Sequence, residues 1–95
     1  MKQLVTKALQ YEGLNQIDAP RGSKVVAVTE VTFNPGVPAI VFLAERDAQL
    51  EPRHFYVTYG SLPSDGDTIK LGAYVGHMKP SGALPWHVFE AKVEQ

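Results

Sequence analysis

The feature of this sequence that most constrains its fold is the interruption of short apolar segments by turn residues. Segment 23–33, SKVVAVTEVTF, is rich in β-branched residues and ends at the turn signal Asn34-Pro35-Gly36. The most loop-like segment is 61–67, SLPSDGD, which again combines Pro, Gly, Ser and Asp. Short strands with brief connections predict an all-β protein, in which residues 1–95 form a single domain. We expect a small antiparallel sandwich or partly open barrel of five to six short strands.

Five segments are predicted to be mostly β: 23–33, 38–44, 53–60, 68–78 and 83–92. Residues 1–12 fit either a helix or a strand, and we favour a strand because the rest of the chain has antiparallel β character. Residues 45–52 have room for one helical turn at most before Pro52. Alternation along the strands predicts that Phe55, Val57 and Phe89 are buried.

The composition excludes several classes of protein. A chain of 95 residues with 44% hydrophobic and 20% charged residues suits one globular core. Its formal charge of −1 argues against general nucleic-acid binding, and the absence of cysteine excludes disulfides and thiolate chemistry. We find no signal peptide and no apolar stretch of membrane-spanning length, so we expect a soluble protein of the cytoplasm.

Three segments carry a resemblance to a protein family. DAPRGSKVVAV, PAIVFLAERDAQLEPRHFYVTYGSLP and YVGHMKPSGALPWHVFE occur in this order. Together, over about residues 17–90, they resemble a family of short uncharacterised proteins of tailed bacteriophages and prophages that end in Gly-x-Leu-x-x-His-Val-Phe-Glu. The chain departs from that family at Ala19-Pro20-Arg21 and in the loop after Gly60, where many relatives carry Gly-His-Pro. The resemblance implies a phage origin and a fold, without implying a reaction. With a phage origin, the cytoplasm in which we expect this soluble protein is that of the host.

The histidines do not predict a metal site. If residues 79–82, KPSG, form a tight hairpin, residue 77 lies opposite residue 84 or 85, and His87 lies opposite Tyr74 or Val75. His77 and His87 are then offset by about 7–10 Å along the ladder, which is too far to share one metal ion. We therefore expect no metal and no cofactor.

Catalysis is not indicated either. The serines lie in turns, and no nucleophile elbow or glycine-rich phosphate loop is present. Glu45, Asp47 and Glu51 form an acidic loop, which Arg46 and Arg53 are close enough to neutralise. We expect no catalytic residues, and binding rather than enzymatic activity.

The segment LPWHVFE, residues 84–90, offers two interpretations. In a strand, Leu84, Trp86 and Val88 share one face, and His87 and Phe89 share the other. Trp86 then fills the core, while His87 is either a structural hydrogen-bonding residue or a ligand-binding one. Aromatic rings beside Lys, Arg or His suit a nucleotide-like ligand, because the rings stack on the base and the cations bind phosphate. The predicted ligand-binding residues are Arg53, His54, Tyr56, His77, Lys79 and Trp86.

These observations favour a non-enzymatic phage-encoded binding protein with a counter-defence role, which captures a host signalling nucleotide or blocks a host protein. The alternative is a virion or assembly accessory protein that acts as a symmetric oligomer, and the third possibility is a small hydrolase. A homo-oligomer is expected in either binding role, because AIVFLA (39–44) and LPWHVF (84–89) offer more two-sided apolar strand than so short a chain covers.

Overall fold

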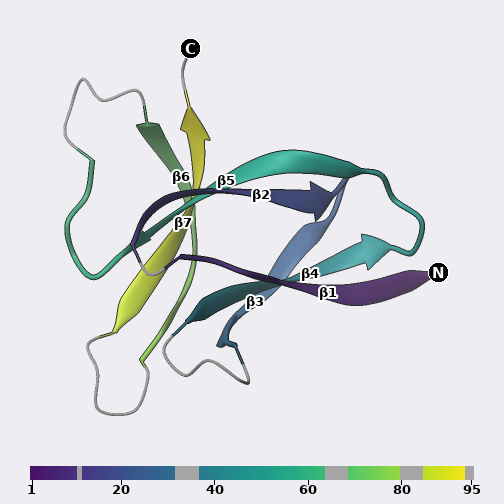
Figure 1. The fold of residues 1–95 in the computed structure, drawn as a ribbon, viewed down its shortest axis with the longest axis horizontal. Coiled ribbons are helices and arrows are strands. Elements are labelled where there is room, and N and C mark those ends of the chain that lie inside the picture. The colour runs from purple at the N-terminus through teal and green to yellow at the C-terminus, as the bar shows by residue number, and fades with distance from the viewer. Residues whose placement is uncertain (11, 32–36, 64–68, 80–84, 94–95) are drawn as a thin grey trace.

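The computed structural model describes residues 1–10, 12–31, 37–63, 69–79 and 85–93, and these form two antiparallel β-sheets (Figure 1). None of the described residues forms a helix that could cross a membrane. The strands are β1 (Lys2–Ala8), β2 (Gly13–Pro20), β3 (Lys24–Glu30), β4 (Pro38–Glu45), β5 (Leu50–Thr58), β6 (Ile69–Met78) and β7 (Trp86–Val93).

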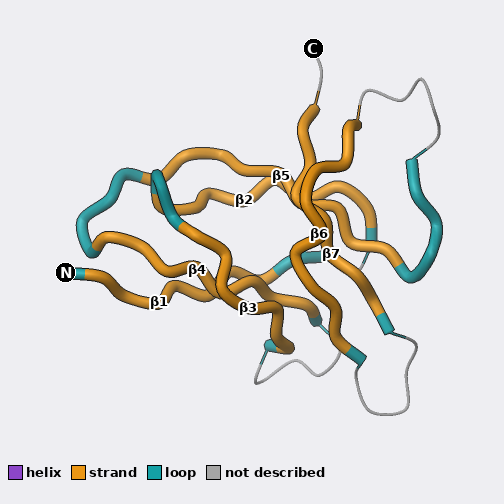
Figure 2. The backbone as a smooth tube through the Cα atoms, turned by 180° about the vertical axis from the view of Figure 1, so that it is seen from behind, coloured by secondary structure: helices purple, strands orange, loops and turns teal. Residues whose placement is uncertain are grey.

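The chain passes three times between the two sheets. One sheet has the order β1-β4-β3 and the other has the order β2-β5-β7-β6, so the chain changes sheet after β1, after β2 and after β4 (Figure 2). The molecule measures 39 × 37 × 17 Å, which is the flat shape of two stacked layers. The predicted small all-β sandwich is confirmed, with seven described strands instead of five to six. The N-terminal segment is a strand, as favoured, and β2 is the strand that the sequence did not predict.

The core lies between the inner faces of the sheets. Ile40 and Phe42 of β4 meet Phe55 and Val57 of β5, and all four are fully buried. The Phe42 and Phe55 rings pack edge to face with centroids 5.9 Å apart, a favourable aromatic geometry. Trp86 also belongs to this core, with none of its surface exposed.

The prediction that Phe89 is buried is wrong, whereas those for Phe55 and Val57 are confirmed. In β7, Trp86 and Val88 point into the core, and the two-residue period of a strand then directs Phe89 outward. Phe89 is partly exposed there.

The register of β6 and β7 corrects a second expectation. His77 lies directly opposite His87, and Met78 lies opposite Trp86, so residues 79–85 connect the strands. The pairing shifts twice along β6, between Leu71 and Tyr74 and again before Gly76, and such shifts are characteristic of β-bulges. The tight turn predicted at 79–82 falls mostly outside the described residues, and the offset predicted between His77 and His87 is wrong.

Two edge strands bring the sheets together on one side. β3 is an edge of the first sheet and β6 is an edge of the second. A Cβ atom added to Gly76 would lie 3.0 Å from Cγ2 of Val28, so the absence of a side chain at residue 76 allows this approach. Nearer the start of β3, a cavity lies between the same two strands.

Candidate functional site

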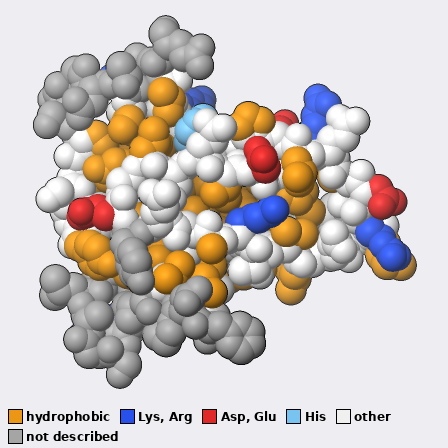
Figure 3. Space-filling model, viewed as in Figure 1, with side chains coloured by type: hydrophobic (Ala, Val, Ile, Leu, Met, Phe, Trp, Pro, Cys, Tyr) orange, Lys and Arg blue, Asp and Glu red, His pale blue; other side chains and the backbone are white. Residues whose placement is uncertain are grey.

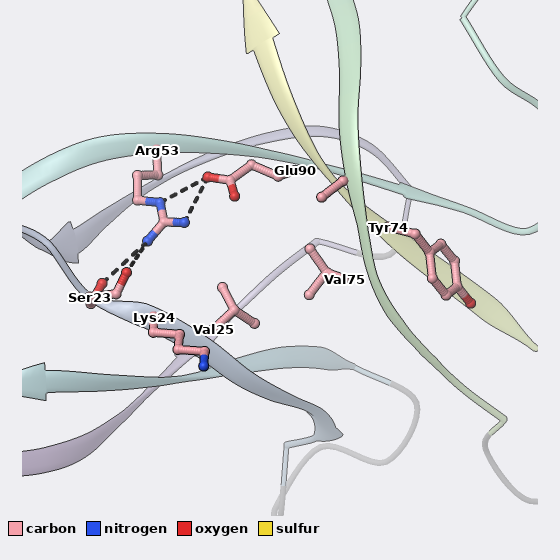
Figure 4. Close-up of a pocket in the computed structure, with 8 residues that line it drawn as sticks. Ser23, Lys24, Val25, Arg53, Tyr74, Val75 and Glu90 are labelled. Carbon is pink, nitrogen blue, oxygen red and sulfur yellow. Dashed lines mark hydrogen bonds and ion pairs between the residues drawn. The ribbon is translucent and has the colours of Figure 1, made fainter.

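An arginine bridges the two sheets at this cavity. The Arg53 Nε and Nη2 atoms donate to Oε2 of Glu90 at 3.1 and 2.7 Å, joining β5 to β7. Its Nη1 donates to the carbonyl oxygen of Ser23 at 3.0 Å and to the Ser23 hydroxyl at 3.3 Å. Figure 4 shows the guanidinium between these two partners. Its Cζ also lies 5.3 and 5.5 Å from the ring centroids of Phe42 and Phe55, within cation–π range.

These contacts make Arg53 primarily a structural residue. All three of its guanidinium nitrogens donate to Glu90 or Ser23. Only 19% of the Arg53 side chain and 38% of the Glu90 side chain are exposed, so separating them would leave a half-buried charge without its partner. Arg53 would have to give up part of this network to bind a ligand phosphate.

The cavity itself has a volume of about 390 Å³. Val25 and Val75 face each other across it, while the Tyr74 side chain points away from it on the far side of β6 (Figure 4). Its remaining lining residues are Ser23, Lys24, Arg53, Ala73 and Glu90. The Arg53–Glu90 ion pair therefore neutralises most of the charge in the cavity.

A second candidate site lies on the outer face of the four-stranded sheet. Tyr56 of β5, Phe89 of β7 and Tyr74 of β6 are aligned by the strand register as one row across three neighbouring strands. Neighbouring strands are about 4.8 Å apart, so this row is about 10 Å long. The next row holds His87 and His77, about 7 Å further along the strands. We call these five residues, together with His54 on β5, the aromatic face.

Four rings of the aromatic face, those of Tyr74, Phe89, His77 and His87, contact one another. Tyr74 packs edge to face on Phe89 at a centroid distance of 5.2 Å, and its hydroxyl lies 2.7 Å from Nδ1 of His87. His77 and His87 lie 5.8 Å apart, centroid to centroid. Tyr74 is 49% exposed, a large aromatic surface to leave in water, and hydrophobic surface of this kind is typical of binding sites.

The charge of this face is compatible with an anionic ligand. In β5 and β7, the acidic residues Glu51 and Glu90 lie on the inner side of the sheet. Asp18 of β2 lies on the outer face opposite Pro52, at the far edge of the sheet from His77 and Lys79. Lys79 follows β6 just beyond His77 and is exposed. Elsewhere, Figure 3 shows charged side chains of both signs scattered over the surface it draws, without the single-sign cluster of a general nucleic-acid interface.

The structure divides the six predicted ligand-binding residues into two groups. His54, Tyr56 and His77 belong to the aromatic face, and Lys79 lies at its end. Arg53 and Trp86 lie on the inner side of the sheet, where Arg53 bridges the sheets and Trp86 is buried in the core. The indole N–H of Trp86 has no hydrogen-bond partner among the described residues.

Three residues of the aromatic face were absent from the predicted set: Tyr74, His87 and Phe89. The alternation of LPWHVFE already placed His87 and Phe89 on one face of a strand. Tyr74 could only be found from the register of β6, because the two bulges break the simple alternation there. His87 bonds to Tyr74, so it makes a structural hydrogen bond and also belongs to an exposed face.

The described residues offer little for catalysis. Ser23 is buried and its hydroxyl is bound to Arg53, and Thr58 uses its hydroxyl to donate to the carbonyl oxygen of Ser61 at 2.5 Å. No three His, Asp or Glu residues of the described ranges come together as a metal-binding cluster.

Comparison with known proteins finds no matching family model, no matching curated protein and no matching solved structure.

Proposed function

We propose that this chain is a non-enzymatic binding protein that holds a nucleotide-like ligand on the aromatic face. The observation that carries the proposal is the row formed by Tyr56, Phe89 and Tyr74, next to the row formed by His87 and His77. Exposed aromatic rings on a sheet are a surface on which bases stack.

The orientation of the ligand follows from the order of the rows. The base lies on the tyrosine and phenylalanine rings, and the phosphate points along β6 towards His77 and Lys79. Stacking contributes about 1–3 kcal/mol per base, and a charge-assisted hydrogen bond contributes about 1.5–3 kcal/mol. A few such contacts, less the cost of association, give a dissociation constant of about micromolar.

The biological role is part of the same proposal. The resemblance to short phage and prophage proteins supports a phage-encoded protein that acts in the host cytoplasm. There it would capture a host signalling nucleotide and so blunt a host defence. The hydrogen bonds of Arg53 to Ser23 and Glu90 favour binding over hydrolysis, because they hold the Ser23 hydroxyl in a structural contact.

Isothermal titration calorimetry against cyclic nucleotides, mononucleotides and ADP-ribose-like compounds tests this proposal. Tyr74→Ala should weaken binding about five-fold to one-hundred-fold, because it removes a stacking surface of 1–3 kcal/mol. Tyr59→Ala is the matched control, since Tyr59 is 39% exposed and follows the end of β5 outside the aromatic row. The nucleotide affinity of the Tyr59→Ala variant should equal that of the wild type.

The role of the Lys79 charge in phosphate binding is tested by the same calorimetric titrations. Lys79→Ala should weaken binding of the phosphate-bearing compounds, whereas Lys24→Ala, on β3 of the other sheet, should not. If no compound binds the wild type, or if Tyr74→Ala and Lys79→Ala bind as tightly as it does, the nucleotide proposal is wrong. A host protein or a virion component would then be the partner to seek.

A further inference from the structure

The corrected register of β6 and β7 places two histidines side by side on the outer face of the sheet. His77 and His87 are direct partners across the two strands, with ring centroids 5.8 Å apart and ring planes inclined by 43°. Both side chains reach solvent, since His77 is exposed and His87 is partly exposed.

This spacing suits one metal ion shared by both rings. An imidazole nitrogen binds a divalent ion at about 2.0–2.1 Å, which puts the metal about 3.2 Å from the ring centroid. Two rings bound to the same ion then have centroids about 4.5 Å apart at a right angle and about 5.2 Å apart at the tetrahedral angle. The observed 5.8 Å is within about 0.6 Å of the tetrahedral value, a difference that a small side-chain rotation closes.

A neighbouring tyrosine orients one of the rings. The Tyr74 hydroxyl lies 2.7 Å from Nδ1 of His87. In the tautomer with its proton on Nδ1, His87 donates to the Tyr74 oxygen, which leaves the lone pair of Nε2 free to bind a metal. A metal-bound histidine characteristically donates its second ring N–H to an oxygen acceptor such as a carboxylate, a backbone carbonyl or water, which fixes the ring and raises its basicity, and the Tyr74 oxygen can take this place.

We propose that His77 and His87 form a two-histidine site for a divalent transition-metal ion. Two imidazoles select Cu²⁺, Ni²⁺ and Zn²⁺ over Mg²⁺ and Ca²⁺, which prefer oxygen ligands. No third His, Asp or Glu of the described residues joins the pair, so water completes the coordination. The site is therefore weaker than a structural site with four protein ligands, and Cu²⁺ binds more tightly than Ni²⁺ or Zn²⁺.

This inference does not depend on the nucleotide proposal, because the metal alone is the probe. Tag-free protein is titrated by calorimetry with CuCl₂, NiCl₂, ZnCl₂ and MgCl₂. The wild type should bind one Cu²⁺, Ni²⁺ or Zn²⁺ ion and no Mg²⁺. Each of His77→Ala and His87→Ala should weaken transition-metal binding at least about ten-fold, since one ligand of two is lost.

His54→Ala is the matched control. His54 is on the same face but lies on β5, with its ring nitrogen 3.2 Å from the Gln16 side-chain oxygen, and its removal should leave the metal affinity unchanged. Thermal melts supply a second measurement, because an ion that binds only the folded state raises the melting temperature. Ni²⁺ should raise it in the wild type and in His54→Ala, and in neither variant of the pair. The proposal is overturned if the wild type binds no transition metal, or if His54→Ala weakens binding as much as His77→Ala and His87→Ala do.

Discussion

At the scale of single residues, the structure distinguishes between two roles of a cation near aromatic residues that the sequence did not distinguish. A cation near aromatic residues can bind a ligand phosphate or hold a core together. Arg53 takes the second role, because its guanidinium lies over Phe42 and Phe55 and bonds to Glu90 and Ser23. A hydrogen-bonded, mostly buried guanidinium of this kind connects strands that are distant in the sequence.

Removal of Arg53 should therefore reduce stability. Arg53→Ala should lower the free energy of unfolding by about 2 kcal/mol, the magnitude of lost charge-assisted hydrogen bonds at a half-exposed pair. Urea denaturation followed by circular dichroism measures the change. Arg46→Ala is the control, because Arg46 lies in an exposed turn, and it should change stability by no more than about 0.5 kcal/mol. Equal stability of the two variants would show that Arg53 does not bridge the sheets.

The single tryptophan reports on the core directly. Trp86 is fully buried among apolar side chains, so its fluorescence emission should be blue-shifted from that of free tryptophan and poorly quenched by acrylamide. Unfolding in urea should shift the emission to longer wavelength and restore quenching. Red-shifted, readily quenched emission from the native protein would contradict the burial of Trp86.

At the scale of strands, the sequence predicts elements better than it predicts their pairing. The β-branched and alternating segments identified β3 to β7, because these residues fit a pleated sheet. β2 was missed because its inward-facing positions include Asn15, a residue typical of turns. Asn15 is buried because its side-chain oxygen accepts from the Gln10 backbone N–H and its amide donates to the Gly13 carbonyl.

The candidate site depends on the register between strands, which the sequence did not predict correctly. Alternation along β5 correctly put His54 and Tyr56 on one face. The proximity of His77 to His87 depends on two bulges in β6 and on the length of the connection to β7. Gly72 and Gly76 in the sequence indicate a bulge or close packing in this strand, but they do not determine the register. The error in the predicted register of β6 and β7 was therefore enough to separate His77 from His87 in the prediction.

The contact between the edge strands β3 and β6 can be tested by substitution of Gly76. Gly76→Val should lower the free energy of unfolding by about 1–3 kcal/mol, because a new side chain would begin only 3.0 Å from Cγ2 of Val28. Thermal unfolding measures the loss. The double variant Gly76→Val with Val28→Ala should recover part of it, since Val28→Ala removes the atom in conflict. Purely additive losses would show that β3 and β6 do not meet at this point.

At the scale of the whole molecule, two sheets cover one core and leave two outer faces of different character. The four-stranded sheet presents the aromatic face. The three-stranded sheet presents aliphatic side chains, among which Leu4 is 66% exposed and pairs in register with Leu43. Exposed aliphatic surface on a flat sheet is typical of subunit interfaces.

We therefore predict a homodimer that associates through the three-stranded sheet. Light scattering should give about twice the 10.4 kDa mass of the chain. Leu4→Glu should return the protein to a monomer, because it places a charge in the interface. Leu62→Glu is the control, since Leu62 is 57% exposed but follows β5 in a loop, and this variant should stay dimeric. A monomeric wild type at all concentrations would contradict the prediction.

The central claim is that the aromatic face is the ligand-binding surface of this protein. Chemical-shift mapping by nuclear magnetic resonance, with the tightest-binding nucleotide of the calorimetric panel, tests it most directly. The largest shifts should fall on Tyr56, Tyr74, His87 and Phe89, while the signals of the cavity residues Ser23, Lys24 and Val25 should stay unchanged. Shifts concentrated at those cavity residues, or a spectrum that no nucleotide changes, would contradict it.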